Sequence, residues 1–319
     1  MAISKNKKPV IGITMGDPAG IGPEIIAKSL RNPSLRKSAR FQMIGNAKIF
    51  ANYFKQSFPH CSIIDISERS HDKIRIAHPN AVSAEASFQY LQVAVDLLKK
   101  KEIDALVTGP VCKEAISSLG HGFFSGHTEF LADSFAIKNF DMMFVCSSLK
   151  TVVVTRHIPL SDVSKALSKE KIYKTIELVN NTLKKIFKIK RPCIAICGLN
   201  PHAGEGGSIG KEEITKIIPA IKKARKNRIN AQGPFPADTI FSPEIARKFD
   251  IVVTMYHDQG TIPVKTLAFN GLVNFTIGLP FIRTSPAHGT AFNIAGKNRA
   301  NPSSMMEAIK LAVMLASKR

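Results

Sequence analysis

The sequence contains no apolar run approaching the roughly 20 residues that a membrane-spanning helix requires, so we expect no membrane segment. Its first apolar stretch, at residues 10–15, is shorter than the roughly 7–15-residue core of a signal peptide, and Gly16-Asp17-Pro18 follows directly. We interpret this stretch as a first strand. The five cysteines are odd in number and scattered, which favours reduced thiols and a cytoplasmic protein over a disulfide framework.

Acidic residues are few relative to basic ones, with 24 Asp and Glu against 45 Lys and Arg and a net charge of +21. One interpretation is a surface that binds nucleic acid or another polyanion. Much of the excess, however, lies at 165–191 and 211–228, where lysines alternate with apolar residues at helical spacing. Neither segment has the aromatic interleaving or zinc-finger spacing of a nucleic-acid-binding domain. We therefore assign the charge to exposed helix faces, where it can attract phosphorylated substrates, and expect no nucleic-acid or membrane partner.

The chain has neither an internal repeat nor a low-complexity linker, and it alternates between strand-like and helix-like patterns. Apolar residues at 84, 88, 91, 95 and 98 step by three and four, which predicts a helix with one buried face. Ser304 and Glu307 have the spacing of a capping box before a C-terminal helix. Such alternation predicts an α/β fold with mostly parallel strands, and 319 residues suit two domains.

Three strand-like runs each deliver a histidine just past their C-terminal end. Residues 151–155 lead to His157, residues 193–197 lead to His202, and the run that ends at 256 leads to His257. An open α/β sheet binds its ligands at this edge. Three imidazoles with an open fourth position are a recurring catalytic zinc arrangement and also suit other divalent metals. A single histidine is more often structural, so it is the shared placement that predicts a metal site.

Several polar and basic side chains near these histidines are of the types that bind a phosphate. Lys265, Asn274 and Arg283 follow His257 at similar intervals, and Thr128 adjoins His127. Phosphates are commonly held by a guanidinium or ammonium together with neutral donors from other loops. In a chain with 45 Lys and Arg, none of these residues identifies a site by itself.

Two glycine-containing stretches remain, at residues 16–24 and 288–302. The first follows a strand and opens a helix, but it is not G-x-G-x-x-G, and no Rossmann dinucleotide fingerprint appears anywhere in the sequence. The second is a long loop of small residues before the last helix. Spacing alone does not give its function.

Taken in order, these segments resemble the PdxA family, the 4-hydroxythreonine-4-phosphate dehydrogenases of the pyridoxal phosphate pathway. The N-terminal signature matches at residues 14–24, and further motifs follow in family order through nearly the whole chain. These motifs lie at 104–113, 126–129, 155–160, 198–207, 233–239, 256–260 and 288–302.

The resemblance implies a two-domain α/β fold similar to isocitrate and isopropylmalate dehydrogenases, with mostly parallel sheets and an active-site cleft between the domains. The first domain would comprise residues 1–130 and 275–319, and the second residues 131–274. The resemblance also implies a homodimer with active sites at the subunit interface.

Residue roles follow from the matching motifs. His157, His202 and His257 become ligands of a divalent metal (Zn²⁺, Mg²⁺ or Co²⁺), with His257 supplied across the dimer interface. The loop at 288–302, including Gly289 and Asn293, resembles an adenosine-binding loop, so NAD is the expected cofactor although the Rossmann motif is missing. The family usually has Asp in place of Asn293; losing that charge removes a repulsion against a 2′-phosphate, and NADP is therefore the alternative. The implied substrate contacts are His127, Thr128, Lys265, Asn274 and Arg283.

The implied reaction is the metal- and NAD(P)-dependent oxidation of 4-phosphohydroxy-L-threonine in pyridoxine biosynthesis. Its product, 2-amino-3-oxo-4-(phosphohydroxy)butanoate, is a β-keto acid that decarboxylates to 3-amino-2-oxopropyl phosphate. The metal would act as a Lewis acid on the substrate hydroxyl. Asp238 and Asp258 are the candidate proton acceptors, although Asp258, next to a ligand, is better placed to orient a histidine.

Three alternatives stay open at this point. A paralogous dehydrogenase could use the same fold and metal on a 4-phosphorylated sugar acid such as threonate or erythronate, or on an unphosphorylated diol. A zinc hydrolase or lyase could use metal-bound hydroxide instead. A non-enzymatic basic protein would show salt-dependent affinity for nucleic acid.

Overall fold

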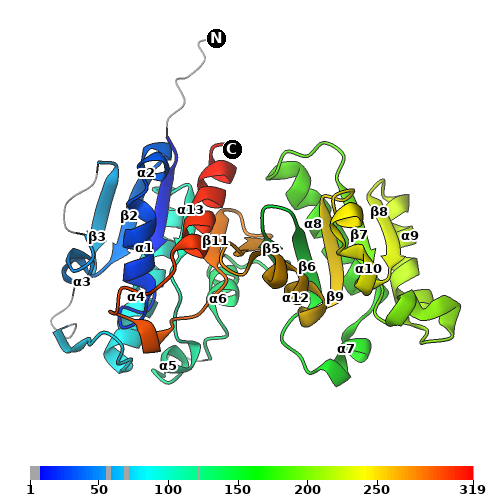
Figure 1. Cartoon of the computed structure of the whole chain (residues 1–319), viewed down its shortest axis with the longest axis horizontal. Coiled ribbons are helices and arrows are strands. Elements are labelled where there is room, and N and C mark those ends of the chain that lie inside the picture. The colour runs from blue at the N-terminus through cyan, green and yellow to red at the C-terminus, as the bar shows by residue number, and fades with distance from the viewer. Residues whose placement is uncertain (1–7, 55–58, 68–71, 121–122, 319) are drawn as a thin grey trace, which may run out of the picture. The chain divides into compact units, whose positions relative to one another are not determined.

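The chain divides into two compact units, which are described separately. Figure 1 shows the computed structural model, which describes residues 8–54, 59–67, 72–120 and 123–318. Unit 1 comprises residues 1–138 and 279–319, and unit 2 comprises residues 139–278. The sequence analysis placed the corresponding divisions after residues 130 and 274.

Unit 1 contains a parallel sheet in the order β3-β2-β1-β4-β11. Its central strands are buried on both faces, which explains why they read as continuous apolar runs rather than alternating ones. The strands are β1 (Val10–Thr14), β2 (Arg40–Gly45), β3 (Cys61–Asp65), β4 (Ala105–Thr108) and β11 (Ile282–Pro286).

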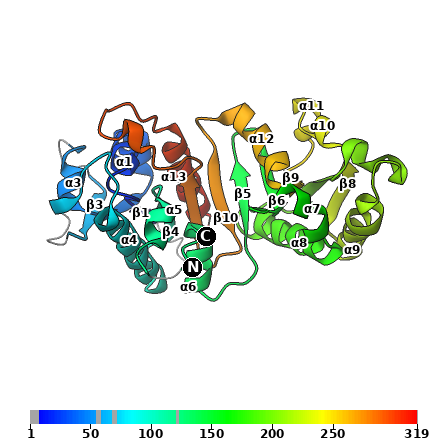
Figure 2. The same cartoon turned by 90° about the horizontal axis from the view of Figure 1, so that it is seen from below.

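Helices cover both faces of this sheet, with α1 on one side and α4 on the other in Figure 2. They are α1 (Gly22–Leu30), α2 (Pro33–Ser38), α3 (Ala47–Ala51), α4 (Ala81–Lys99), α5 (Lys113–Ser117), α6 (His127–Ser134) and α13 (Ser303–Ala316), with a short 3₁₀ turn, η4, at Phe292–Ile294.

Helix α4 confirms the predicted periodicity and starts at a cap that the sequence analysis did not identify. The Asn80 side chain accepts a hydrogen bond from the Ser83 amide, and the Ser83 hydroxyl accepts one from the Asn80 amide. Four of the five predicted apolar positions are buried, and the fifth, Phe88, packs edge-on against Phe124 and Phe130. One face of α4 is therefore fixed on the sheet.

The capping box predicted at Ser304 is wrong. Helix α13 begins two residues earlier than predicted, with Pro302 as its N-cap residue, and has no side-chain cap. The Ser304 hydroxyl instead accepts a hydrogen bond from the Ala287 amide at 3.1 Å, just after β11. Ser304 could cap a helix by its residue type, but here its side chain joins α13 to the residue that follows β11.

Unit 2 contains a mixed sheet in the order β10-β5-β6-β9-β7-β8. Strands β6, β9, β7 and β8 are parallel, whereas β5 runs antiparallel to both of its neighbours. The strands are β5 (Asp141–Val145), β6 (Lys150–Thr155), β7 (Cys193–Cys197), β8 (Asn230–Phe235), β9 (Ile251–Tyr256) and β10 (Val273–Ile277).

The helices of unit 2 also lie on both faces of its sheet, as α12 and α8 show on either side of β6 in Figure 2. They are α7 (Leu160–Ala166), α8 (Lys169–Lys185), α9 (Ile218–Lys226), α10 (Ala237–Ile240), α11 (Pro243–Ala246) and α12 (His257–Ala268), with a 3₁₀ turn η2 (Pro201–Gly207) and a π turn η3 (Glu213–Ile217). In the part of the chain that the structure describes, no helix combines the length and apolarity that crossing a bilayer requires.

The strand order in the sheet of unit 2 explains why the three histidines share one placement. Strands β6, β9 and β7 are consecutive neighbours and run parallel, so their carboxyl ends meet at one edge of the sheet. His157, His257 and His202 follow these strands in that order. The predicted α/β class with mostly parallel strands is confirmed.

Candidate functional site

His157 and His257 lie side by side in unit 2. Thr155 at the end of β6 pairs with Tyr256 at the end of β9, and the two histidines follow these residues. Their ring centroids are 5.6 Å apart with an interplanar angle of 45°. Two imidazoles that bind one ion at metal–nitrogen distances of about 2.0–2.1 Å have ring centres roughly 5 Å apart. The pair therefore fits two ligands of a single cation.

The orientation of His257 is fixed by its neighbours. Its Nδ1 lies 2.7 Å from Asp258 Oδ1 and donates to that carboxylate, and the ring meets Phe144 edge-on. This contact leaves Nε2 as the nitrogen available to a ligand. A carboxylate that holds the second ring nitrogen is the usual partner of a metal-binding histidine, so the contact supports the orienting role considered for Asp258.

His202 has a different environment. Its side chain is 62% exposed, and its Nδ1 lies 2.7 Å from Glu205 Oε1. This hydrogen bond is the main reason that the pKa of His202 is raised above its usual value, and the charges of Glu205 and Asp238 act in the same direction. Among the residues that the structure describes, no three His, Cys, Asp or Glu side chains are arranged to hold a metal. Within one chain, the three histidines thus do not form a complete three-ligand metal site among the described residues.

The loop that carries His202 adopts an unusual backbone that depends on Glu213. Five consecutive residues, 202–206, have φ between 41° and 82°, a left-handed run that non-glycine residues rarely adopt. Buried Glu213 accepts hydrogen bonds from the Leu199 and Asn200 amides at 2.7 and 2.8 Å, and a Cβ on Gly204 would lie 2.6 Å from its second oxygen. The sequence analysis missed Glu213; the signal available was an acidic residue among the apolar positions of a basic helical segment.

Arg283 is the most deeply buried of the predicted substrate contacts in unit 1. It lies on β11, is 2% exposed, and donates to Thr108 Oγ1 at 2.6 Å and Thr128 Oγ1 at 3.4 Å. Burial lowers the pKa of its guanidinium to about 10, while the charge of Glu129 acts in the opposite direction. Thr108, at the end of the neighbouring strand β4, was not predicted as a site residue.

His127 lies beside Arg283 and has a polar atom without a partner. Burial lowers the pKa of its imidazole well below the usual value, and the charges of Arg283 and Lys113 add to this effect, so the ring is neutral near pH 7. Its Nε2 is covered from solvent and has no hydrogen-bond partner among the described residues. Buried polar atoms are normally paired, so this nitrogen is suited to a bound ligand.

Lys113 extends this cationic group, and the sequence analysis did not identify it. Its Nζ would lie 3.1 Å from a Cβ placed on Gly126, the residue that precedes α6. Helix α6 starts at His127, so the positive end of its dipole points to the same place. An ammonium, a guanidinium and a helix N-terminus together favour an anion.

The other two predicted substrate contacts, Asn274 and Lys265, belong to unit 2. Asn274 Nδ2 donates to Met142 Sδ at 3.7 Å, and its Oδ1 is covered and has no hydrogen-bond partner in the described part of the chain. Lys265 is exposed on α12. The predicted contacts therefore divide between the units, with His127, Thr128 and Arg283 in unit 1.

The remaining candidates are exposed or unobstructed. Asp238 on α10 and Asp258 on α12 both face solvent, as does Asn293 in η4. A Cβ on Gly289 would meet nothing within 4 Å. Space for a ligand is thus present at both predicted cofactor residues.

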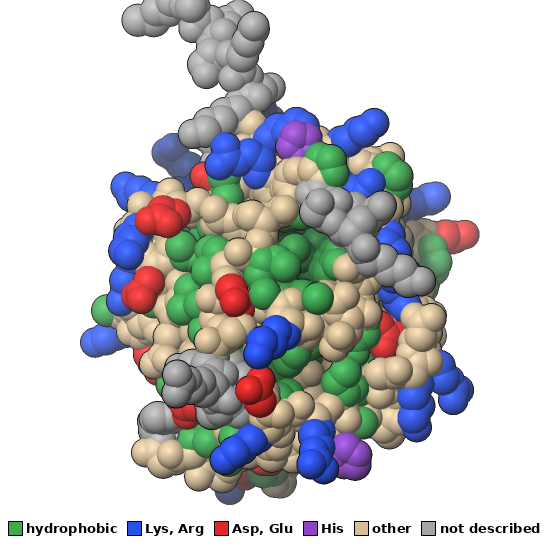
Figure 3. Space-filling view, turned by 90° about the vertical axis from the view of Figure 1, so that its left-hand side faces the viewer, with side chains coloured by type: hydrophobic (Ala, Val, Ile, Leu, Met, Phe, Trp, Pro, Cys, Tyr) green, Lys and Arg blue, Asp and Glu red, His purple; other side chains and the backbone are tan. Residues whose placement is uncertain are grey.

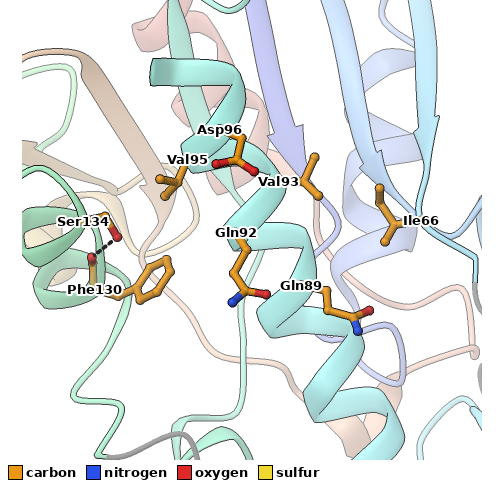
Figure 4. Close-up of a pocket in the computed structure, with 8 residues that line it drawn as sticks. All are labelled: Ile66, Gln89, Gln92, Val93, Val95, Asp96, Phe130 and Ser134. Atoms are coloured by element: carbon orange, nitrogen blue, oxygen red, sulfur yellow. Dashed lines mark hydrogen bonds between the residues drawn. The ribbon is translucent and has the colours of Figure 1, made fainter. Parts of the chain in front are cut away.

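One open hollow in unit 1 does not coincide with these residues. Figure 4 shows a hollow of about 630 Å³ in unit 1, which α4, α6 and Ile66 line. None of the predicted site residues contributes to it. On the face of unit 1 shown in Figure 3, hydrophobic side chains gather near the centre and Lys and Arg side chains are spread around it. The positive charge on this face is therefore dispersed and does not form one continuous patch.

Comparisons with known proteins agree on one family. The model described as "Pyridoxal phosphate biosynthetic protein PdxA" matches residues 22–312. A 4-hydroxythreonine-4-phosphate dehydrogenase of Desulforapulum autotrophicum is 41% identical and covers 98% of this chain and 97% of its own. A D-threonate 4-phosphate dehydrogenase of Cupriavidus necator is also 41% identical, with 98% of both chains covered.

Solved structures give the same result. The crystal structure of 4-hydroxythreonine-4-phosphate dehydrogenase from Klebsiella pneumoniae matches with a TM-score of 0.86 and 36% identity, over 97% of this chain and 99% of the other. Isocitrate dehydrogenase from Methylococcus capsulatus, at 14% identity and a TM-score of 0.53 over 97% of this chain and 88% of the other, shares the fold alone. The predicted resemblance in fold is confirmed, and the chain belongs to the PdxA family.

Proposed function

We propose that the protein oxidises 4-phosphohydroxy-L-threonine to 2-amino-3-oxo-4-(phosphohydroxy)butanoate, which loses CO₂ to give 3-amino-2-oxopropyl phosphate. The observation that carries this proposal is the pair of imidazoles, His157 and His257, 5.6 Å apart at the carboxyl edge of a sheet in a PdxA-family chain. A divalent cation, Zn²⁺, Mg²⁺ or Co²⁺, would supply Lewis-acid chemistry that lowers the pKa of the substrate hydroxyl. A nicotinamide cofactor, NAD or NADP, would accept the hydride.

The cationic group of unit 1 is suited to the substrate phosphate. Arg283 and Lys113 provide positive charge, and Thr128 provides a neutral donor. Burial, and then the charges of Arg283 and Lys113, keep the His127 ring neutral. Its hydrogen bond to the Gly109 backbone raises the pKa and therefore uses the ring N–H, so the unpaired Nε2 is an acceptor for a substrate hydroxyl or a protonated phosphate oxygen. Anchoring the phosphate fixes the reacting carbon, a positioning effect that contributes several kcal/mol in enzymes.

In unit 2, Asn274 and Lys265 provide the complementary polar contacts. The covered Oδ1 of Asn274 accepts a hydrogen bond, which suits an amino or hydroxyl group of the substrate. Asp238 is proposed as the proton acceptor, because Asp258 already accepts a hydrogen bond from His257 Nδ1–H.

The proposed active form is a cytoplasmic homodimer. The family resemblance implies that His257 serves the partner's site, whereas the 5.6 Å separation of His157 and His257 allows both to bind one cation within a chain. Helix α12 starts at His257 and exposes Ile262 and Leu267, and Phe269, which directly follows the helix, is 77% exposed. Large apolar side chains gathered on one exposed helix are typical of a protein interface. This arrangement supports a partner subunit that contacts α12.

A hybrid dimer tests the sharing of His257. When the His157→Ala and His257→Ala variants are mixed or co-expressed, sharing between subunits leaves one site with all three histidines, so activity returns from near zero to a substantial fraction of wild type. If each chain uses only its own histidines, both sites in the hybrid lack one ligand and activity stays at the level of the single variants. The second result would remove the shared-site proposal.

A second candidate substrate is D-threonate 4-phosphate, which the Cupriavidus necator relative is named for at 41% identity. It differs from the first by a hydroxyl in place of the amino group. Turnover of each substrate with NAD and with NADP, followed through nicotinamide absorbance, distinguishes the two by their kcat/KM. Absence of cofactor reduction with either phosphorylated compound, in the presence of divalent metal, would contradict the proposed dehydrogenase.

A further inference from the structure

The loop at residues 288–302 is held in a shape that its own sequence does not favour. Ala291, Gly296 and Asn298 all have positive φ, at 43°, 76° and 56°. Glycine and asparagine tolerate this region, but a left-handed alanine persists only where surrounding contacts impose it. The contacts that impose this shape come from the start of the chain.

Two charged side chains of helix α1 make most of these contacts. Lys28 Nζ donates to Glu24 Oε1 at 2.8 Å and to the carbonyl oxygens of Asn298 and Ala300 at 2.9 Å each. The same oxygen of Glu24 accepts a hydrogen bond from the Ala300 amide at 2.8 Å. The ion pair thus ties three backbone groups of the loop to a helix that lies more than 250 residues earlier in the sequence.

Burial makes this pair unlike an ordinary surface salt bridge. The Glu24 side chain is 1% exposed and that of Lys28 is 18% exposed. Lys310 and Glu307 on α13 form a pair of similar length, 2.8 Å, but their side chains are 49% and 45% exposed. Exposed pairs contribute little, whereas removing one partner of a buried pair leaves an uncompensated charge and is costly.

Neighbouring contacts hold the two ends of the loop in the same way. The Ile21 amide donates to Thr290 O at 3.0 Å, and the Ser29 hydroxyl contacts Pro302 O at 3.4 Å. A Cβ on Gly20 would lie 2.9 Å from Thr290 O, which is too close for any side chain. Helix α1 and the turn before it therefore contact the loop near both of its ends.

We propose that Glu24 and Lys28 are positioning residues for the nicotinamide cofactor. They hold the loop, with Gly289 and Asn293 on it, in the shape that receives the adenosine end, and they do not touch the cofactor themselves. This inference rests on the proposed function of the loop. Preorganising a binding loop raises affinity because less conformational entropy is lost when the ligand binds.

The test compares Lys28→Met with Lys310→Met. The first removes the three donor contacts but keeps most of the aliphatic chain, and the second removes a matched lysine that contacts no loop. We expect Lys28→Met to weaken NADH binding, measured by fluorescence titration, and to raise the cofactor KM by about tenfold, the size of effect that ordering a loop produces. The KM for the phosphorylated substrate and kcat at saturating cofactor should change by less than about twofold, since the anion site is untouched. Lys28→Arg should recover part of the affinity.

A purely structural role for the pair would lower the melting temperature and leave cofactor affinity intact. Hydrogen exchange at residues 288–302, measured below the melting temperature, should be faster in Lys28→Met and in Glu24→Gln than in wild type. Unchanged NADH affinity and unchanged loop exchange in a folded Lys28→Met protein would overturn this inference alone. Failure of the wild-type protein to bind NADH or NADPH would instead overturn the proposed function.

Discussion

The two units hold their candidate residues in opposite surroundings. In unit 1, Arg283 is 2% exposed and His127 has a covered, unpaired nitrogen, so burial shifts both pKa values. In unit 2, His157 and His202 face solvent, and His257 is half-buried. The anion site is thus formed by contacts within one unit, whereas the histidines require a bound cation, a partner subunit or both to complete them.

The largest expected effect tests the exposed histidines of unit 2. His157→Ala should lower kcat/KM by about 10³-fold or more, because metal-ion stabilisation of developing charge contributes several kcal/mol. Activity and bound metal should be lost together, as elemental analysis of the same samples would show. His78→Ala, at an exposed histidine of unit 1, is the matched control. Full activity in a preparation shown to be free of divalent metal would end the metal proposal.

The second prediction concerns the buried anion site of unit 1. Arg283→Ala should raise the KM for the phosphorylated substrate by about 10²-fold or more, since removing one partner of a buried charged contact costs about 2–5 kcal/mol. Lys113→Met should raise it by about tenfold, because that ammonium is exposed and lies at the edge of the site.

Arg247→Ala provides the control for a general loss of positive charge, because Arg247 is exposed on unit 2. Steady-state kinetics at saturating cofactor measure all three variants. An unchanged KM for Arg283→Ala would remove this residue, and with it the buried anion site, from the proposal.

Local patterns were sufficient for the parts of the molecule that depend on short stretches. The apolar run before His257 predicted β9, and the three-and-four stepping from residue 84 predicted α4. Parallel pairing of β6, β9 and β7 then explains why three separate histidines reach one edge. Each inference needed only periodicity and the rule that parallel strands end together.

Long-range contacts account for what the sequence did not predict. Lys28 meets the carbonyl of Ala300, 272 positions away, and Glu213 meets the Asn200 amide through a left-handed loop. Ser304 had the chemistry of a cap but bonds to Ala287. Nothing in the spacing of these residues indicates their partners, because tertiary structure selects among several contacts that each side chain could make.

A third prediction uses the buried carboxylate of unit 2. Burial raises the pKa of Asp141 to about 6 from its ordinary 3.8, although Arg156, Thr175 and Lys171 act in the opposite direction. Because the folded state then binds more protons than the unfolded state, ionising Asp141 destabilises the fold as pH rises from about 4 to 6. The shift corresponds to about 3 kcal/mol.

Asp141→Asn isolates this effect, since the amide does not titrate. Relative to wild type, the variant should gain about 3 kcal/mol in free energy of unfolding between pH 3 and 7, as urea denaturation at each pH would measure. Other titrating groups are common to both proteins and cancel in the difference. A difference that does not change with pH would mean that Arg156 compensates the buried charge fully.

The smallest expected effect decides the role of Asp258. If this carboxylate orients His257 through the 2.7 Å contact with Nδ1, then Asp258→Asn should weaken metal affinity by about tenfold, as measured by competition with a chelating dye, while kcat at saturating metal stays near wild type. If Asp258 is instead the proton acceptor, metal affinity should hold, kcat should fall sharply, and the limb of the pH–rate profile that reports the base should disappear. Glu244→Gln, at an exposed acid of α11, controls for the loss of one negative charge. The direct contact with a histidine favours the first outcome, which would leave Asp238 as the proton acceptor and assign Asp258 to orienting His257 on the cation.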